Sequence, residues 1–281
     1  MPRLSNNFVM KGSGAKGRVL IIAGSDSGGG AGIQADIKAV SAAGGYAATA
    51  ITAITVQNTL GVSAVHPVPL DIIEGQMRAV LDDIGADAIK TGMLATADVV
   101  RLVARVLRET AADIPLILDP VMVATSGDVL LAADAITAVR EELLPLAALV
   151  TPNAPEAEKL TGLTVSNVGE QAEAGRALVA AGAKAALVKG GHLTGPVVHD
   201  VLVTATEMRV FESPRIATTN THGTGCTLAS AIAARIALGM SLVDAVEGAG
   251  RYLHEAIVRA PGFGSGHGPV DHVWPLRDAA R

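Results

Sequence analysis

The chain has 281 residues, 49% of them hydrophobic, and a formal net charge of −5 from 22 Lys and Arg against 27 Asp and Glu. This acidic balance, with no long basic or apolar run, argues against a nucleic-acid partner and against a membrane span. The single cysteine excludes an internal disulfide framework and suits a reducing compartment, so the expected location is cytoplasmic.

Short apolar runs alternate with helical patterns after residues 1–17, a polar stretch that predicts a disordered leader. The runs start about 30 to 40 residues apart, the span of a βαβ unit. We therefore predict one α/β domain over residues 18–281, with a doubly wound, mostly parallel sheet and helices on both faces. Predicted strands span residues 18–24, 46–55, 86–92, 116–122, 148–153 and 185–190, and residues 200–216 predict small antiparallel elements. Predicted helices span residues 31–43, 69–84, 96–110, 134–144, 168–181 and 240–260.

A glycine-rich turn follows the first predicted strand, in the segment AGSDSGGGAG over residues 23–32. Glycine lets the backbone approach a ligand closely. The segment lacks a clean G-x-G-x-x-G pattern, and no acidic residue follows the second strand to bind a ribose. A Rossmann oxidoreductase is therefore the least favoured alternative.

Charged and amide side chains stand where three later strands end. Asp119 and Lys189 each end an apolar run, where a charged residue usually has a task. Asn153 and Glu156 have the spacing of a helix capping box, which is the structural alternative to a carboxylate holding Mg²⁺ on a nucleotide phosphate. No Walker-type G-x-x-x-x-G-K-[ST] and no G-x-S-x-G elbow is present.

The segment Thr-His-Gly-Thr-Gly-Cys at residues 221–226 precedes a helical pattern. A glycine turn before a helix presents unpaired N–H groups and a favourable dipole to an anion. Cys226, the only cysteine, stands at this position. A free cysteine is often an inert buried residue, but a helix N-terminus lowers a thiol pKa, so we expect an accessible thiolate here.

Seven motifs in order resemble the hydroxymethylpyrimidine/phosphomethylpyrimidine kinase branch of the ribokinase superfamily. They are AGSDSGGGAGIQAD at 23–36, AITVQNT at 53–59, KTGML at 90–94, DPVMVATSGD at 119–128, TPNAPE at 151–156, KGGH at 189–192 and NTHGTGC at 220–226. The resemblance implies a ribokinase-like fold. It also implies ATP-dependent phosphorylation of 4-amino-5-hydroxymethyl-2-methylpyrimidine, and then of its monophosphate, for thiamine biosynthesis.

The resemblance also assigns site residues. Six would line the aminopyrimidine pocket, namely Gly24, Ala31, Asp36, Gln57, Met93 and Val121. Asp119 and Glu156 would order Mg²⁺, and Asn153 and Lys189 would lie near the phosphates of ATP. The backbone of Gly223, Thr224, Gly225 and Cys226 would hold the transferring phosphoryl group.

Cys226 stands where sugar kinases of the superfamily usually carry an aspartate, and it is the predicted general base. The alternatives are a pyridoxal kinase of the same superfamily, whose substrate aldehyde could react with this thiol, and a non-catalytic pyrimidine or nucleotide sensor. Asp119, Glu156 and Cys226 together argue against a sensor, because a binder needs neither metal ligands nor a base. Dimers are common in the family, so a homodimer is expected by analogy.

Overall fold

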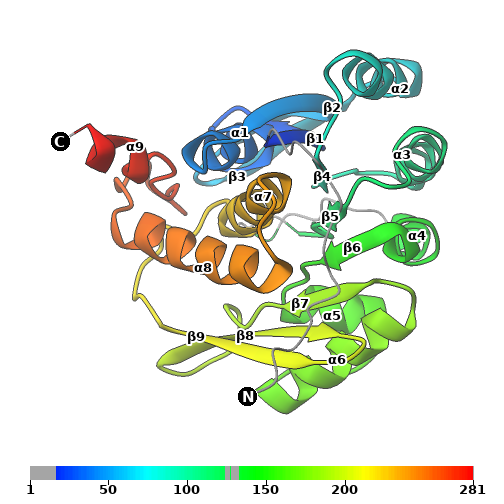
Figure 1. Cartoon of the computed structure of the whole chain (residues 1–281). Helices are drawn as coiled ribbons and strands as arrows, with labels where there is room; N and C mark the ends of the chain where they lie inside the picture. The colour runs from blue at the N-terminus through cyan, green and yellow to red at the C-terminus, as the bar shows by residue number, and fades with distance from the viewer. Residues whose placement is uncertain (1–16, 124–126, 128–132, 281) are drawn as a thin grey trace.

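Nine strands form one sheet in the computed structural model, which describes residues 17–123, 127 and 133–280 (Figure 1). The order across the sheet is β3-β2-β1-β4-β5-β6-β7-β8-β9. The strands are β1 (Arg18–Asp26), β2 (Tyr46–Asn58), β3 (Gly61–Pro67), β4 (Ala88–Thr91), β5 (Leu116–Leu118), β6 (Ala147–Val150), β7 (Ala185–Val188), β8 (Val197–Thr204) and β9 (Met208–Pro214). The six central strands β2, β1, β4, β5, β6 and β7 pair in parallel, whereas β3, β8 and β9 at the edges pair in antiparallel fashion. The predicted doubly wound, mostly parallel sheet is confirmed.

Helices cover both faces of this sheet (Figure 1). They are α1 (Gly32–Ala42), α2 (Leu70–Ala79), α3 (Ala97–Thr110), α4 (Ala133–Ala138), α5 (Ala154–Thr161), α6 (Val168–Ala180), α7 (Thr224–Ala237), α8 (Leu242–Val258) and α9 (Trp274–Ala279). One core layer packs under α2 to α6, and the other packs under α1, α7 and α8. In β1, Leu20 and Ile22 face the first layer, while Val19 and Ile21 face the second. A strand buried on both faces reads as the continuous apolar run seen in the sequence.

The boundaries differ from the prediction in two informative places. β3 was not predicted, because all seven of its residues are exposed or half-buried and they form no continuous apolar run. β5 ends at Leu118 instead of residue 122. Its continuation is interrupted by Pro120, which has no N–H for the sheet, and by a turn in which the N–H of Val121 donates to the carbonyl oxygen of Asp119.

Within the described residues, no helix is both long and apolar enough to cross a bilayer. Residues 1–16 of the predicted leader over residues 1–17, and residues 124–126 and 128 of the DPVMVATSGD motif, lie outside the described part. That residues 18–281 act as one domain stays a prediction.

The chain reverses its direction of travel across the sheet between β1 and β4. From β1 it goes outward to β2 and β3, and it then returns to β4 on the other side of β1. Ligands of open α/β sheets bind beyond the carboxyl ends of the strands at such a point. A ligand site is therefore expected at this edge of the sheet.

Candidate active site

An open cavity of about 1890 Å³ lies along the carboxyl edge of the sheet and continues beside α8. All but one of the fourteen residues predicted for the site line it: Gly24, Ala31, Gln57, Met93, Val121, Asp119, Asn153, Glu156, Lys189, Gly223, Thr224, Gly225 and Cys226. One small-molecule pocket typically occupies about 300–1,000 Å³. The cavity is therefore large enough for two ligands side by side.

The anion loop, residues 221–225, leads directly into α7. Gly223 is the N-cap of α7 and has a φ of +75°, a conformation that favours glycine. A β-carbon at this position would collide with the backbone of the loop after β1, lying 2.8 Å from the carbonyl carbon of Gly30 and 3.0 Å from the α-carbon of Ala31. The first turn of a helix has N–H groups without helical partners. The loop therefore presents donors to an anion while touching the glycine-rich loop.

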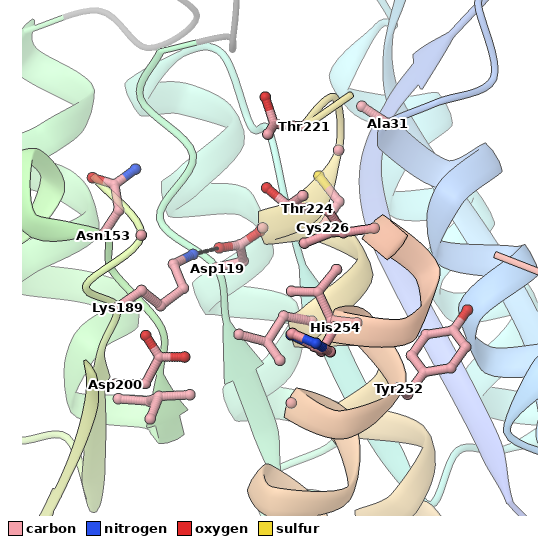
Figure 2. Close-up of a pocket in the computed structure, with 18 of the residues that line it drawn as sticks. Ala31, Asp119, Asn153, Lys189, Asp200, Thr221, Thr224, Cys226, Tyr252 and His254 are labelled. Atoms are coloured by element: carbon pink, nitrogen blue, oxygen red, sulfur yellow. Dashed lines mark hydrogen bonds and ion pairs between the residues drawn. The ribbon is translucent and has the colours of Figure 1, made fainter. Parts of the chain in front are cut away.

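Asp119 and Lys189 face each other across the floor of the cavity (Figure 2). Lys189 Nζ lies 3.3 Å from Asp119 Oδ1, which also accepts a hydrogen bond of 3.2 Å from Thr151 Oγ1. A β-carbon on Gly225 would lie 3.3 Å from Lys189 Nζ and 3.9 Å from Asp119 Oδ2. Glycine at this position therefore lets both charges reach the N-terminus of α7.

Glu156 and Asn153 form the capping box of α5. The Asn153 N–H donates to Glu156 Oε2 at 2.8 Å, and the Glu156 N–H donates to Asn153 Oδ1 at 2.9 Å. Asn153 also forms a bridge with Lys189 between the ends of β6 and β7. The structural interpretation of this motif is thus correct, and both side chains line the cavity as well.

The two carboxylates at this edge suit a hard cation. Asp119 Oδ2 is buried and has no hydrogen-bond partner among the described residues. Burial raises the pKa of Glu156 to about 7, with Lys189 opposing the rise and Asp119 adding to it. No group of three or more His, Cys, Asp and Glu in the described ranges could hold a metal. Since Mg²⁺ is commonly bound by one or two carboxylates plus substrate phosphates and water, these residues fit it.

Comparisons with known proteins agree with this geometry. Residues 26–271 match the model of the phosphomethylpyrimidine kinase family. The chain belongs to this family.

The chain is 46% identical over 258 residues to a hydroxymethylpyrimidine/phosphomethylpyrimidine kinase of Streptomyces coelicolor, covering 92% of this chain and 95% of that one. It is 48% identical over 263 residues to a thiamine biosynthesis bifunctional protein of Geobacter sulfurreducens, covering 94% of this chain. The match spans 54% of that longer protein. The ADP complex of Bacillus subtilis pyridoxal kinase superposes with a TM-score of 0.85 at 37% identity, covering 92% of this chain and 98% of that one.

The kinase keeps five predicted pocket residues together on the side of the cavity formed by β1, β2 and the segment after β4. Met93 is buried, and its terminal methyl group lies so close to Gly24 that a β-carbon there would be 2.5 Å from it. Gln57 is half-buried, and its Oε1 accepts a hydrogen bond of 3.1 Å from Thr55 Oγ1. Ala31 and Val121 complete this group at the boundary with the anion loop and Asp119.

Asp36 corrects the sequence prediction, because it does not line the cavity of this kinase. Its side chain is fully buried, and both carboxylate oxygens lie within 3.0 Å of Lys90 Nζ. Oδ1 also accepts a 2.7 Å hydrogen bond from Ser230 Oγ. A carboxylate held in this way by an ammonium and a hydroxyl cannot also contact a ring in the pocket.

The pKa expected for Cys226 is also corrected. Burial raises the pKa of the thiol to about 12, and Asp36 and Asp119 add to the rise while Lys90 opposes it. Desolvation of the thiolate therefore outweighs the helix N-terminus. The side chain is half-buried and lines the cavity, so its position agrees with the prediction, but at neutral pH it is a thiol.

The sequence analysis did not predict the hydrogen bond between Asp26 and His222, which joins the two loops of the site. Asp26 accepts hydrogen bonds from the N–H groups of Gly28, Gly30 and Ala31, and its Oδ2 lies 2.9 Å from His222 Nε2. These hydrogen bonds, with that from His222 the strongest, outweigh burial and lower the pKa of Asp26. The signal in the sequence was an acidic residue just before three glycines and a histidine inside the anion loop.

Proposed function

We propose that the chain transfers the terminal phosphoryl group of ATP to 4-amino-5-hydroxymethyl-2-methylpyrimidine, and then to the resulting monophosphate, for thiamine biosynthesis. One observation carries the proposal. The five predicted pocket residues around Met93 line one cavity together with the anion loop, Asp119 and Lys189. A flat ring and a nucleotide phosphate therefore have adjoining places, and the names of the relatives support this pair of acceptors.

The nucleotide phosphates are assigned to the edge formed by Asn153, Lys189 and the anion loop. Lys189 stays charged, because Asp119 and Glu156 raise its pKa against the effect of burial. It can therefore neutralise a phosphate as a point charge. When bound by Asp119 and Glu156, Mg²⁺ would neutralise phosphate charge and cancel part of the negative charge that raises the Cys226 pKa.

The acceptor hydroxyl lies, in this proposal, between the pocket residues and the anion loop. N–H groups at the start of α7 stabilise the charge on the transferring phosphoryl group. Cys226 accepts the hydroxyl proton as the bond forms, after its own proton has left to solvent. Phosphoryl transfer draws mainly on positioning and electrostatics, so a base of which only a small fraction is deprotonated at neutral pH can suffice. The second acceptor is a phosphate oxygen, which is already anionic and needs no base.

The test is an assay of ADP release with Mg-ATP, in which the hydroxymethylpyrimidine, its monophosphate and pyridoxal are offered in parallel. Turnover of both pyrimidines is expected. Turnover of pyridoxal alone would show that pyridoxal, and not the pyrimidine, is the substrate. The likeness to the Bacillus subtilis pyridoxal kinase favours this alternative. No ADP formation with any acceptor, in protein shown to be folded, would support the non-catalytic sensor.

Cys226→Ala tests the proton acceptor. We expect the first phosphorylation to fall by a factor on the order of 10² or more, the usual contribution of general base catalysis. The second phosphorylation should fall less. A near-normal rate of the first phosphorylation would show that Cys226 is not the base and would leave the kinase assignment intact. Equal losses in both phosphorylations would contradict a role for Cys226 in the first one alone.

Cytoplasmic location, a Mg²⁺ requirement and a homodimer stay predictions. For a dimer, Ile54 and Val56 offer apolar side chains on one face of β2, with 52% and 59% of their surface exposed. Size-exclusion chromatography with light scattering measures the oligomeric state directly.

A further inference from the structure

The cavity continues beyond Lys189, away from the acceptor pocket at β1 and β2, into a part lined by β8, the segment after β9, and α8. Its walls carry apolar side chains, namely Val198, Ile216, Leu253 and Ile257. Because the phosphoryl group that is transferred lies next to the acceptor, the nucleoside end of the donor must point the other way. This part of the cavity therefore suits the nucleoside.

Asp200 of β8 lines this part of the cavity directly beside the place assigned to the phosphates. Its Oδ1 accepts a hydrogen bond of 2.9 Å from the N–H of Gly190, the residue after Lys189. Figure 2 shows the Asp200 carboxylate below Lys189, with His254 of α8 across the cavity from it. A ligand that extends from the phosphates toward α8 therefore passes this carboxylate.

The backbone on both sides of this hydrogen bond is held in place. A β-carbon on Gly190 would overlap the carbonyl oxygen of His199, so glycine lets the turn after β7 pack directly against β8. Gln171 is fully buried, and its Nε2 donates to the carbonyl oxygens of Val188 at 2.9 Å and of His199 at 2.8 Å. The position of the Asp200 carboxylate relative to the phosphates is therefore well defined.

Asp200 differs from the other acidic side chains around this part of the cavity. Each of those has a side-chain partner: Glu212 with His199, Asp244 with Ser241, Glu247 with Arg251 and Glu255 with Arg259. Among the described residues, the N–H of Gly190 is the one hydrogen-bond donor to Asp200. An ionised carboxylate can accept about four hydrogen bonds. A ligand with hydroxyl groups would therefore supply donors that the protein does not.

We propose that Asp200 is a nucleotide-binding residue, which accepts hydrogen bonds from the ribose hydroxyl groups of ATP and so favours ribonucleotides over deoxyribonucleotides. The negative charge of Asp200 repels a phosphate, so the fitting partner is a neutral group with donors. The ribose is such a group, and it follows the phosphates directly in the nucleotide. A site built to bind a hydroxyl rejects the analogue that lacks it, because the polar group of the site is then left unpaired. The inference rests on the proposed function, since it starts from phosphates placed at Lys189.

The test is equilibrium binding by isothermal titration calorimetry, without an acceptor, of ADP, 2′-deoxyADP and 3′-deoxyADP in the presence of Mg²⁺. At least one deoxynucleotide should bind the full chain about tenfold more weakly than ADP, the usual effect of a hydrogen bond to a charged group. In Asp200→Asn the amide oxygen still accepts from the N–H of Gly190, but the charge is lost, so the preference should shrink to about threefold or less. Two deoxynucleotides that bind the full chain as tightly as ADP, or an undiminished preference in Asp200→Asn, would overturn the proposal.

Gln171→Ala is the matched control, because it removes a support of the same turn and its side chain is too deeply buried to touch a nucleotide. It should weaken the three nucleotides alike and keep the preference for ADP. Loss of the preference in Gln171→Ala would show that the turn and not the carboxylate decides it, and would overturn the proposal. If Asp200→Asn does not fold, Asp200→Ser is subject to the same comparison.

Kinetics separate this inference from the proposed function. A ribose preference that depends on Asp200, in protein that phosphorylates none of the acceptors, would keep the ribose site and overturn the proposed function. Turnover of the pyrimidines at equal kcat/KM with ATP, 2′-deoxyATP and 3′-deoxyATP would keep the proposed function and overturn the ribose site.

Discussion

Gly223→Ala should disable this kinase while leaving it folded. Gly223 has a φ of +75°, and a methyl group there would overlap the carbonyl group of Gly30 and press on Ala31. These are backbone atoms held by Asp26, so they cannot move aside as a flexible side chain would. The anion loop must therefore shift away from the glycine-rich loop by a distance on the order of 1 Å, and a misplacement of about that size can cost 10²-fold in rate.

Gly239 offers a matched control at the other end of α7. Its φ is +87°, and a β-carbon there would meet nothing within 4 Å. Alanine at either position should lower the stability by about 1–2 kcal/mol, because the backbone stays in the left-handed conformation. Only in Gly223→Ala does the added methyl group also collide with the glycine-rich loop. The comparison separates backbone strain from displacement of the loop.

Two measurements decide the result. The free energy of unfolding, from urea titration, should fall in both variants, and kcat for the first phosphorylation should fall about 10²-fold in Gly223→Ala alone. If Gly223→Ala keeps a kcat within about threefold of Gly239→Ala, the close contact between the two loops is not needed for catalysis.

Three further predictions concern the carboxylates. Asp119→Asn should lower kcat by about 10²-fold or more and raise the Mg²⁺ concentration that gives half-maximal ADP release; an unchanged Mg²⁺ dependence would contradict its metal role. Because burial raises the pKa of Glu156 to about 7, the folded state keeps a proton that the unfolded chain releases near the ordinary glutamate pKa of 4.5. The stability of the metal-free protein should therefore fall as pH rises between these values. Urea unfolding in EDTA at both ends of this pH range measures this loss of stability. The loss should be smaller in Glu156→Gln than in the parent chain, and an equal loss in both would refute the raised pKa of Glu156. In Asp26→Ala the free energy of unfolding should fall by about 2 kcal/mol or more, because four hydrogen-bond donors lose a charged acceptor. Asp26→Asn keeps one acceptor oxygen, so its free energy of unfolding should fall less in the same urea titration.

Much of the fold could be predicted because the apolar pattern is a local property of the chain. The strands at the centre of the sheet are buried on both faces, so each appears as an uninterrupted apolar run, as in Val19 to Ala23. β3 has no such pattern because it lies at an edge with most of its residues exposed, and only its hydrogen bonds to β2 define it as a strand. The end of β5 was also placed too late, because the apolar residues Val121 and Met122 continue past the proline that ends the pairing.

The sequence by itself determined the parallel sheet, the helix that begins at the anion loop and the polar residues at the strand ends, because each depends on residue type and on neighbours in the chain. Only the tertiary structure decided how these residues are used. It turned Asp36 away from the pocket toward Lys90, since a buried ammonium on another strand needs a partner. It paired Asp26 with His222 across 196 positions of sequence. It also made Cys226 a thiol with a raised pKa, because desolvation depends on every element packed around the sulfur and not on its place at the start of a helix.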